Sequence, residues 1–138
     1  MRAIEHCVPA HHYAYEADAE AGLGHREAAL VISNEALRMT RTRGENWLEA
    51  ELVRRRGELL RDRDAVAEEL FCEAIEIAQR QQAKLWELRA ATCLARLWHD
   101  QGRRAEAHDL LAPVYGWFTE GLDTPDLKEA KALLDELA

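Results

Sequence analysis

Apolar residues recur along much of the chain at intervals of three and four, the spacing of one face of an α-helix. After residue 66 this stripe consists of Ala67, Leu70, Phe71, Ala74, Ile77 and Ala78. A second stripe, after residue 87, consists of Leu88, Ala91, Leu94, Ala95 and Trp98. Strand-type composition is nearly absent, whereas the strong helix formers Ala, Leu, Glu and Arg dominate. The pattern therefore predicts an all-α protein.

Turn and cap signals divide this pattern into separate helices. Gly24 and Gly102 each lie five residues before a small residue, at a point where a helix ends and a left-handed residue is expected. Between them the turn is Asp62-Arg63-Asp64, and Asp64 is the expected N-cap of the next helix. Further helix starts are expected at Trp47, through Asn46 and Glu49, and at Thr124-Pro125. The last helix has Leu127, Ala130, Leu134 and Leu137 on its apolar side.

Small residues repeat at long range. Ala17, Gly57 and Ala95 form one set, Ala29, Ala67 and Ala107 a second, and Ala36, Ala74 and Val114 a third, with spacings of 38 or 40 residues. The repeat predicts helical hairpins at about 9–43, 46–82 and 84–119, followed by a capping helix at about 125–137, all in one domain over residues 1–138. Because one hairpin cannot bury its apolar stripe alone, neighbouring hairpins are expected to stack.

This order of small residue, turn, small residue, Phe or Leu, and small residue resembles the tetratricopeptide repeat. Unit two matches best, at Gly57, Ala67, Phe71 and Ala74, while unit three matches more loosely at Ala95, Ala107, Leu111 and Val114. The early tryptophan of the family is displaced, since Trp47 and Trp86 precede the expected place. The resemblance implies a right-handed superhelical stack of three hairpins plus the capping helix, and a role in protein–protein interaction.

Residues 45–138 also resemble the extreme C-terminus of large bacterial signalling proteins. The resemblance lies in LRAATCLARLW at 88–98, QGRRAEA at 101–107, and the segments 110–121 and 122–134. Those proteins combine a class III adenylate/guanylate cyclase domain, a P-loop ATPase domain and a tetratricopeptide tail. The likeness implies such a tail or a stand-alone relative. Neither the cyclase metal aspartates nor a G-x-x-x-x-G-K-[ST] loop is present, so neither activity is expected here.

Composition narrows the classes of partner. The net charge of −8 argues against nucleic acid, although positive charge gathers around Arg54-Arg55-Arg56. There is no apolar run long enough to span a membrane and no secretory signal at the N-terminus. Cys7, Cys72 and Cys93 are odd in number and far apart, which predicts reduced thiols in a cytoplasmic protein.

Catalytic and metal chemistry have weak support in the sequence. His6, Cys7, His11 and His12 are metal-ligand residue types, but they lack the defined spacing of a zinc site. Carboxylates are frequent, yet there is no sign of a pocket, and Cys72 and Cys93 are expected to be small core residues on apolar stripes. We therefore expect no metal, no cofactor and no catalytic residue.

The first helix of each hairpin is expected to line an inner groove. The inward positions are Glu51, Arg54, Glu58 and Arg61 in unit two, and Arg89, Thr92, Arg96 and His99 in unit three. Four arginines on one ladder suit a groove for an acidic peptide or an acidic domain surface. In the alternative interpretation these arginines are solvated and pair with Glu51, Glu58 and Glu87 at helical spacings.

A second candidate surface is the first helix, at about 9–22. Its apolar stripe of Tyr13, Ala14, Ala17, Ala21 and Leu23 has no upstream cap in this sequence, which suggests a homodimer. The sequence as a whole favours a non-catalytic protein-interaction or scaffold module with a regulatory role in bacterial signalling. Three alternatives remain: an effector-sensing tail of a cyclase/ATPase protein, a small-ligand-binding repeat domain, and an enzyme fragment.

Overall fold

The computed structural model describes residues 24–44 and 48–138. Within these ranges the chain forms helices and no strand, which confirms the all-α prediction. The helices are α3 (Arg26–Arg43), α4 (Glu49–Leu59), α5 (Asp64–Arg80), α6 (Lys84–Asp100), α7 (Arg104–Gly116) and α8 (Pro125–Leu137). None of these helices is both long enough and apolar enough to cross a lipid bilayer.

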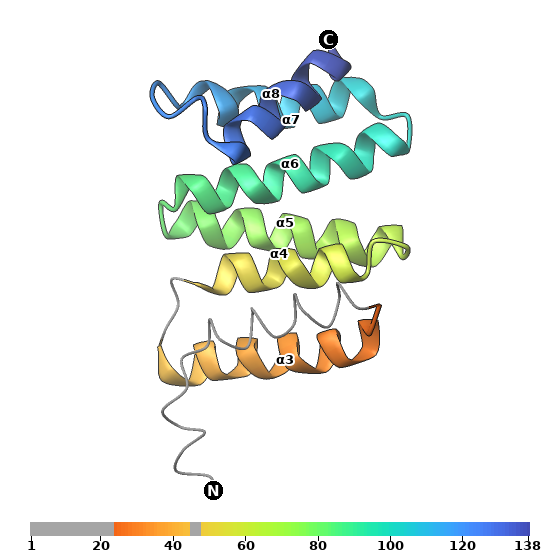
Figure 1. The fold of residues 1–138 in the computed structure, drawn as a ribbon, viewed down its shortest axis with the longest axis vertical. Helices are drawn as coiled ribbons and strands as arrows, with labels where there is room; N and C mark the ends of the chain where they lie inside the picture. The colour runs from red at the N-terminus through yellow and green to blue at the C-terminus, as the bar shows by residue number, and fades with distance from the viewer. Residues whose placement is uncertain (1–23, 45–47) are drawn as a thin grey trace, which may run out of the picture.

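Consecutive helices pack against each other from α3 at one end of the molecule to α8 at the other (Figure 1). In addition, α4 contacts α6, and α6 contacts α8, across the intervening helices. We call these three helices the α4–α6–α8 layer. Arg89 bonds to Glu51 near the start of α4, and Arg61 near its end bonds to Asp100. The contacts therefore follow the same order along both helices, so α4 and α6 run in the same direction.

The repeated small residues lie where the helices approach each other. Six of them are alanines with 0% exposure: Ala29, Ala36, Ala67, Ala74, Ala95 and Ala107. Gly57 is buried as well, and a Cβ atom added there would lie 2.6 Å from Cε1 of the fully buried Phe71. The packing of α4 on α5 therefore requires glycine at this position. Val114 is only partly buried, and Ala17 lies outside the described residues.

The structure confirms the two turns predicted at glycines, but the helix start after the turn between α4 and α5 differs from the prediction. Gly24 and Gly102 have positive φ values of 81° and 78°, as expected for residues that end a helical turn. The N-cap of α5 is Arg63, so the prediction of Asp64 was wrong. Asp64 is instead the first helical residue, where its carboxylate interacts favourably with the positive end of the helix dipole. The predicted start at Asn46 and Trp47 lies outside the described residues.

The last helix begins at Pro125, as expected, and packs on α6 and α7. Its fully buried face contains Leu133, whereas the predicted Leu134 is only partly buried. Arg104 of α7 donates hydrogen bonds from Nε to the Leu137 carbonyl at 3.0 Å and from Nη2 to the Glu136 carbonyl at 2.9 Å. A cation at this end of α8 satisfies carbonyls that the helix leaves unbonded. Both contacts fix α8 to the rest of the stack.

Several predictions concern residues 1–23, which are outside the described part of the chain. These are the possible metal ligands His6, Cys7, His11 and His12, and the apolar stripe from Tyr13 to Leu23. The homodimer through the first helix therefore stays a prediction.

Candidate binding groove

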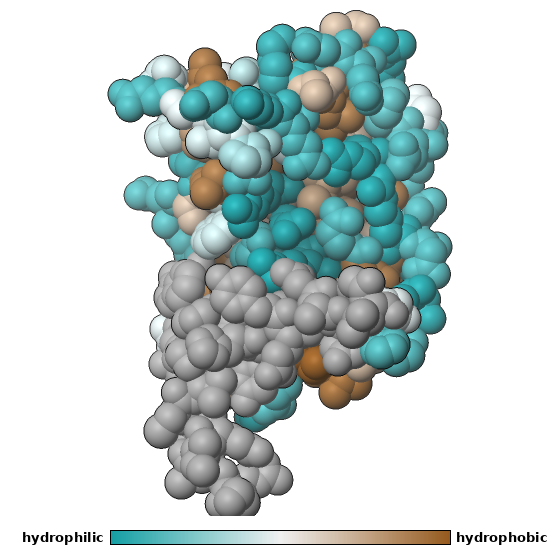
Figure 2. All heavy atoms as spheres, in the orientation of Figure 1, coloured by the Kyte–Doolittle hydropathy of each residue, from teal (hydrophilic) through white to brown (hydrophobic). Residues whose placement is uncertain are grey.

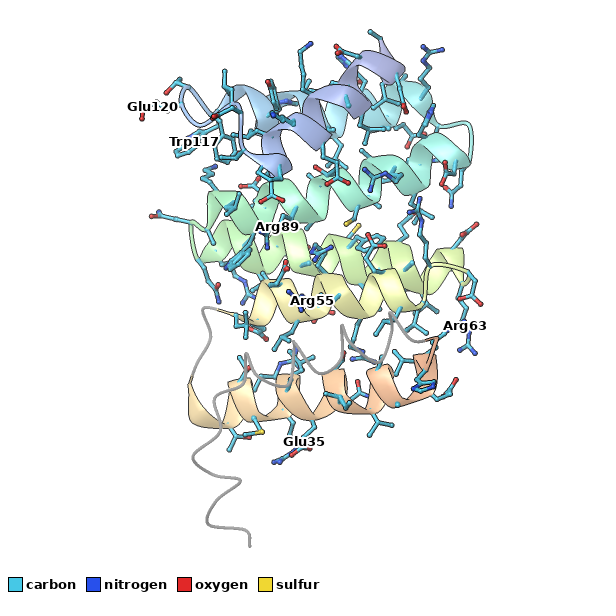
Figure 3. All side chains as sticks on the ribbon, viewed as in Figure 1. Glu35, Arg55, Arg63, Arg89, Trp117 and Glu120 are labelled. Carbon is cyan, nitrogen blue, oxygen red and sulfur yellow. The ribbon has the colours of Figure 1, made fainter. Side chains whose placement is uncertain are left out.

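The α4–α6–α8 layer is hollowed by a polar groove with a volume of about 230 Å³. Seen from the side of Figure 2, the described surface is largely hydrophilic, and Figure 3 shows Arg55 on α4 and Arg89 on α6 in this region. Three helices supply the lining: Glu51, Arg54, Arg55 and Glu58 from α4, Arg89, Thr92, Cys93 and Arg96 from α6, and Asp126 and Glu129 from α8. Five of the seven residues that we expected to bind a partner are therefore together: Arg54, Glu58, Arg89, Thr92 and Arg96.

Glu51 forms the floor of the groove, and its side chain is only 2% exposed. Arg54 grips the carboxylate with two hydrogen bonds, of 2.8 and 2.9 Å. Nε of Arg55 and Nη1 of Arg89 bond to the same Oε2 atom at 3.2 and 3.1 Å. Burial alone would raise the pKa of Glu51, but the hydrogen bonds and charge of Arg54, with the charges of Arg55 and Arg89, outweigh burial and lower it. Glu51 is therefore ionised and holds three guanidinium groups in place.

Arg89 and Arg96 connect α6 to α8. Nε of Arg89 donates to Asp126 at 3.0 Å, so this α6 side chain bonds to α8 as well as to Glu51 of α4. The guanidinium of Arg89 also lies 4.9 Å from the ring centroid of Trp86. Nη2 of Arg96 donates to Glu129. The side chains of Arg89 and Arg96 remain 31% and 32% exposed, so solvent reaches both cations.

Cys93 of α6 contacts two charged residues of α4, Glu58 and Arg54. Its thiol donates to Oε1 of Glu58 at 2.8 Å, and Nη1 of Arg54 lies 3.4 Å from the sulfur. Burial raises the pKa of this thiol to about 12; the charge of Arg54 opposes the change, and the charge of Glu58 adds to it. The thiol is therefore protonated at neutral pH, whereas nucleophilic and metal-binding cysteines act as thiolates.

Arg61 and His99, the other two predicted site residues, do not line the groove. Nη2 of Arg61 donates to Asp100 at 2.7 Å, at the ends of α4 and α6. Nε2 of His99 lies 3.8 Å from a carboxylate oxygen of Glu136 on α8. These contacts join the same three helices beyond the groove, which is consequently shorter than the ladder we expected.

The arginines of the groove have carboxylate partners within the chain. Pairing along one helix, which we considered as the alternative, occurs between Arg54 and Glu51. The contacts of Arg89 and Arg96 run instead between helices. Thr92 donates its hydroxyl to the Leu88 carbonyl of its own helix at 2.8 Å. Guanidinium groups of the groove therefore already bind carboxylates within the chain, and the same groups could bind carboxylates of a partner.

Sequence reasoning missed the groove residues on α8. Asp126 follows Arg89 by 37 residues, and Arg89 follows Glu51 by 38. Extending the repeat period into the last helix would have placed Asp126 beside Arg89. The sequence pattern directed attention to the apolar side of that helix and not to its carboxylates.

The shifted pKa values of the groove do not favour catalysis. A general base or nucleophile functions best with a pKa near neutral pH. The pKa of Glu51 is lowered and that of Cys93 is raised, so both move away from neutrality. Among the described residues, no group of three or more His, Cys, Asp and Glu side chains is arranged to hold a metal ion.

The outer side of α5 carries an acidic hollow of about 290 Å³, lined by Glu68, Glu69, Cys72, Glu73 and Glu76. Cys72 is exposed here, so its predicted place in the core was wrong. It follows the buried Phe71 directly and therefore points about 100° away from the apolar stripe. Partial burial and the charges of Glu68 and Glu76 raise the pKa of its thiol.

Neither a protein-family model nor a curated protein sequence matches this chain. The resemblance to the tetratricopeptide repeat therefore rests on the signature residues and their spacing. The function has to be inferred from the chemistry of the groove.

Proposed function

We propose that this chain is a non-catalytic protein–protein interaction module whose groove on the α4–α6–α8 layer holds an acidic segment of a partner protein. We further propose that its hairpins form a right-handed superhelical stack of the tetratricopeptide type with α8 as the capping helix. The observation that most supports the interaction is the combination of exposure and carboxylate binding at Arg89 and Arg96. Both are partly exposed, and both already bind carboxylates from another helix.

The chemistry of the guanidinium group supports carboxylate binding at these positions. Arginine has five N–H donors in a planar fork and stays charged at all relevant pH values. The bond from Arg96 to Glu129 uses Nη2, so the other N–H groups of this guanidinium can donate hydrogen bonds to a ligand oxygen. Glu51 and the ring of Trp86 restrict the position of Arg89 before any ligand arrives. Such preorganisation lowers the entropic cost of binding.

The groove is less suited to the alternative functions. Pockets for small molecules usually exceed about 300 Å³ and are mostly apolar. This groove has about 230 Å³ and is lined mainly by charged side chains. Catalysis is disfavoured by the pKa values of Glu51 and Cys93. The charged lining instead offers electrostatic complementarity to a charged segment of another polypeptide.

The resemblance of residues 45–138 to the tails of bacterial cyclase–ATPase proteins supports a regulatory role in cytoplasmic signalling. An effector-sensing tail of such a protein would use the same groove. We expect no nucleic acid partner because the net charge is −8, and no membrane partner because the sequence lacks an apolar run long enough to span a bilayer. A cyclase or ATPase coding sequence immediately upstream in the same gene would support this context, and an unrelated reading frame would contradict it.

A binding titration tests the proposal. Fluorescence anisotropy is measured for a fluorescein-labelled Asp/Glu-rich peptide and for its Asn/Gln counterpart, at low and at high salt. We expect binding of the acidic peptide only, weakened by salt because exposed charges are screened. Replacing Arg89 and Arg96 by Gln should weaken binding at least about tenfold. Arg54 is kept because its loss would leave the buried Glu51 without its main partner.

The matched control replaces Arg63 and Arg80 by Gln, which removes the same charge at the two ends of the outer helix α5. Both positions are exposed, and neither lines the groove. The control should bind the acidic peptide within about twofold of the unmodified protein, because charges outside the interface change affinity little. Failure of the unmodified protein to bind, or equal weakening in both variants, would refute the proposal.

A further inference from the structure

α8 presents two carboxylates to the groove from consecutive turns of one helix. Asp126 bonds to Arg89 and Glu129 bonds to Arg96, both on α6. The next contact in this direction joins His99 to Glu136, so α6 and α8 run in the same direction along the contact. A partner helix with two acidic side chains one turn apart would offer the groove the same groups.

We propose that the groove recognises an acidic segment with two carboxylates one helical turn apart, and that Asp126 and Glu129 of α8 compete with this segment for Arg89 and Arg96. This inference rests on the proposed function. To that function it adds the spacing of the partner's two carboxylates, and it assigns to Asp126 and Glu129 the role of competitors that lower the affinity for the partner. The partner is identified only by this chemistry.

The guanidinium pair has the geometry of a two-point site. Arg89 and Arg96 are seven residues apart on the same face of α6, about two turns, and their side chains converge on Asp126 and Glu129, which are three residues apart on α8. Both are held from the side of α4 or α8, while about a third of each side chain stays exposed. Two carboxylates on one rigid helix can bind both cations without the entropic cost of ordering two separate segments.

The carboxylates of α8 can be exchanged without the helix leaving its place. The side chain of Glu129 is 53% exposed and that of Asp126 is 25% exposed, and ion pairs with such exposure stabilise a fold only slightly. The helix itself is anchored by its apolar face, Leu127, Ala130, Leu133 and Leu137. Its carbonyl end is bonded to Arg104. A competing pair of carboxylates therefore has to displace only the side chains of Asp126 and Glu129, and not the helix α8.

The decisive variant replaces Asp126 by Asn and Glu129 by Gln, which keeps the shape of both side chains and removes their charge. The probe is a fluorescein-labelled, alanine-based helical peptide with one Asp-x-x-Glu pair, and its Asn-x-x-Gln form serves as the uncharged reference. Loss of both internal ion pairs should tighten binding of the acidic probe about tenfold. Replacing Glu129 alone by Gln should tighten it about threefold, which keeps the inference testable if the double variant folds poorly.

The control replaces Glu120 by Gln and Asp123 by Asn, in the connection between α7 and α8. It changes the net charge by the same amount, and Figure 3 shows Glu120 at the edge of the molecule, away from Arg89. This control should bind the probe like the unmodified protein. If the unmodified protein binds and the groove variant binds no tighter than the control, the competitor role is refuted while the proposed function stands. If none of the proteins binds the acidic probe, both fail.

Discussion

Replacing Gly57 by Ala tests the close approach of α4 and α5 in the stack. The added Cβ would lie 2.6 Å from Cε1 and 2.8 Å from Cδ1 of Phe71. Carbon atoms in contact prefer separations of about 3.5–4.0 Å, so the helices or the ring would have to move by about 1 Å. Phe71 is 0% exposed and close-packed, which leaves the ring no space to retreat.

Two opposing effects set the size of the change. Overpacking of a core usually costs about 1–3 kcal/mol of unfolding free energy. Replacement of glycine by alanine inside a helix gains up to about 1 kcal/mol, because alanine loses less backbone entropy. We therefore expect Gly57→Ala to destabilise the protein by about 1–2 kcal/mol, even though alanine is the better helix former.

Urea unfolding followed by circular dichroism measures the change, with Gly116→Ala as the matched control. Gly116 is the last residue of α7, and a Cβ there meets nothing within 4 Å. The control should therefore be neutral or stabilising by less than about 1 kcal/mol. Replacing Phe71 by Leu shortens the side chain, so Gly57→Ala should cost less in that background, and the double variant should lose less stability than the sum of the two single losses. A Gly57→Ala variant as stable as the Gly116→Ala control would refute the packing account.

Three further predictions concern the groove. Glu51→Gln should lower the unfolding free energy by about 3 kcal/mol in urea titrations, because breaking a buried ion pair leaves Arg54 without its main carboxylate partner; a loss below about 0.5 kcal/mol would contradict this. The pKa of Glu51 is lower in the folded protein than its ordinary value of 4.5, so its contribution to stability is present above pH 4.5 and is lost as the pH falls towards the lower folded value; the stability of Glu51→Gln should fall less over this range, and parallel pH profiles would exclude the effect. In a protein with Cys7 replaced by Ser, mass spectrometry should find iodoacetamide on Cys72 before Cys93, because Cys72 is exposed whereas Cys93 is buried with its pKa raised to about 12. Equal rates would contradict the burial of Cys93 in the groove.

The sequence pattern predicted the helices and the small contact residues well, because both depend on local spacing. A stripe such as that of Ala67, Phe71 and Ala74 places its residues on one helical face whatever lies opposite. Cys72 was misplaced because its apolar character was considered without its angle from that stripe. Asp64 was misplaced by one residue, and helix ends are the least certain part of any pattern.

The groove was predicted only in part, because its contacts form between helices distant in sequence. Periodicity indicated that Arg54, Arg89 and Arg96 share a layer. It gave no information on whether their partners lie on the same helix or on the next one. Asp126 and Glu129 become groove residues only through the packing of α8 on α6. The resulting series of Glu51, Arg89 and Asp126 alternates in charge across the layer and shapes the site.

The most direct test of the central claim, that the α4–α6–α8 layer binds an acidic protein segment, is an NMR titration of the full chain with the Asp-x-x-Glu peptide. Arginine Nε–H signals and backbone amides are followed together. The account predicts saturable shifts of the side-chain signals of Arg89 and Arg96, with amide shifts confined to α4, α6 and α8. Spectra that do not change, or shifts centred on the outer helices α5 and α7, would contradict it.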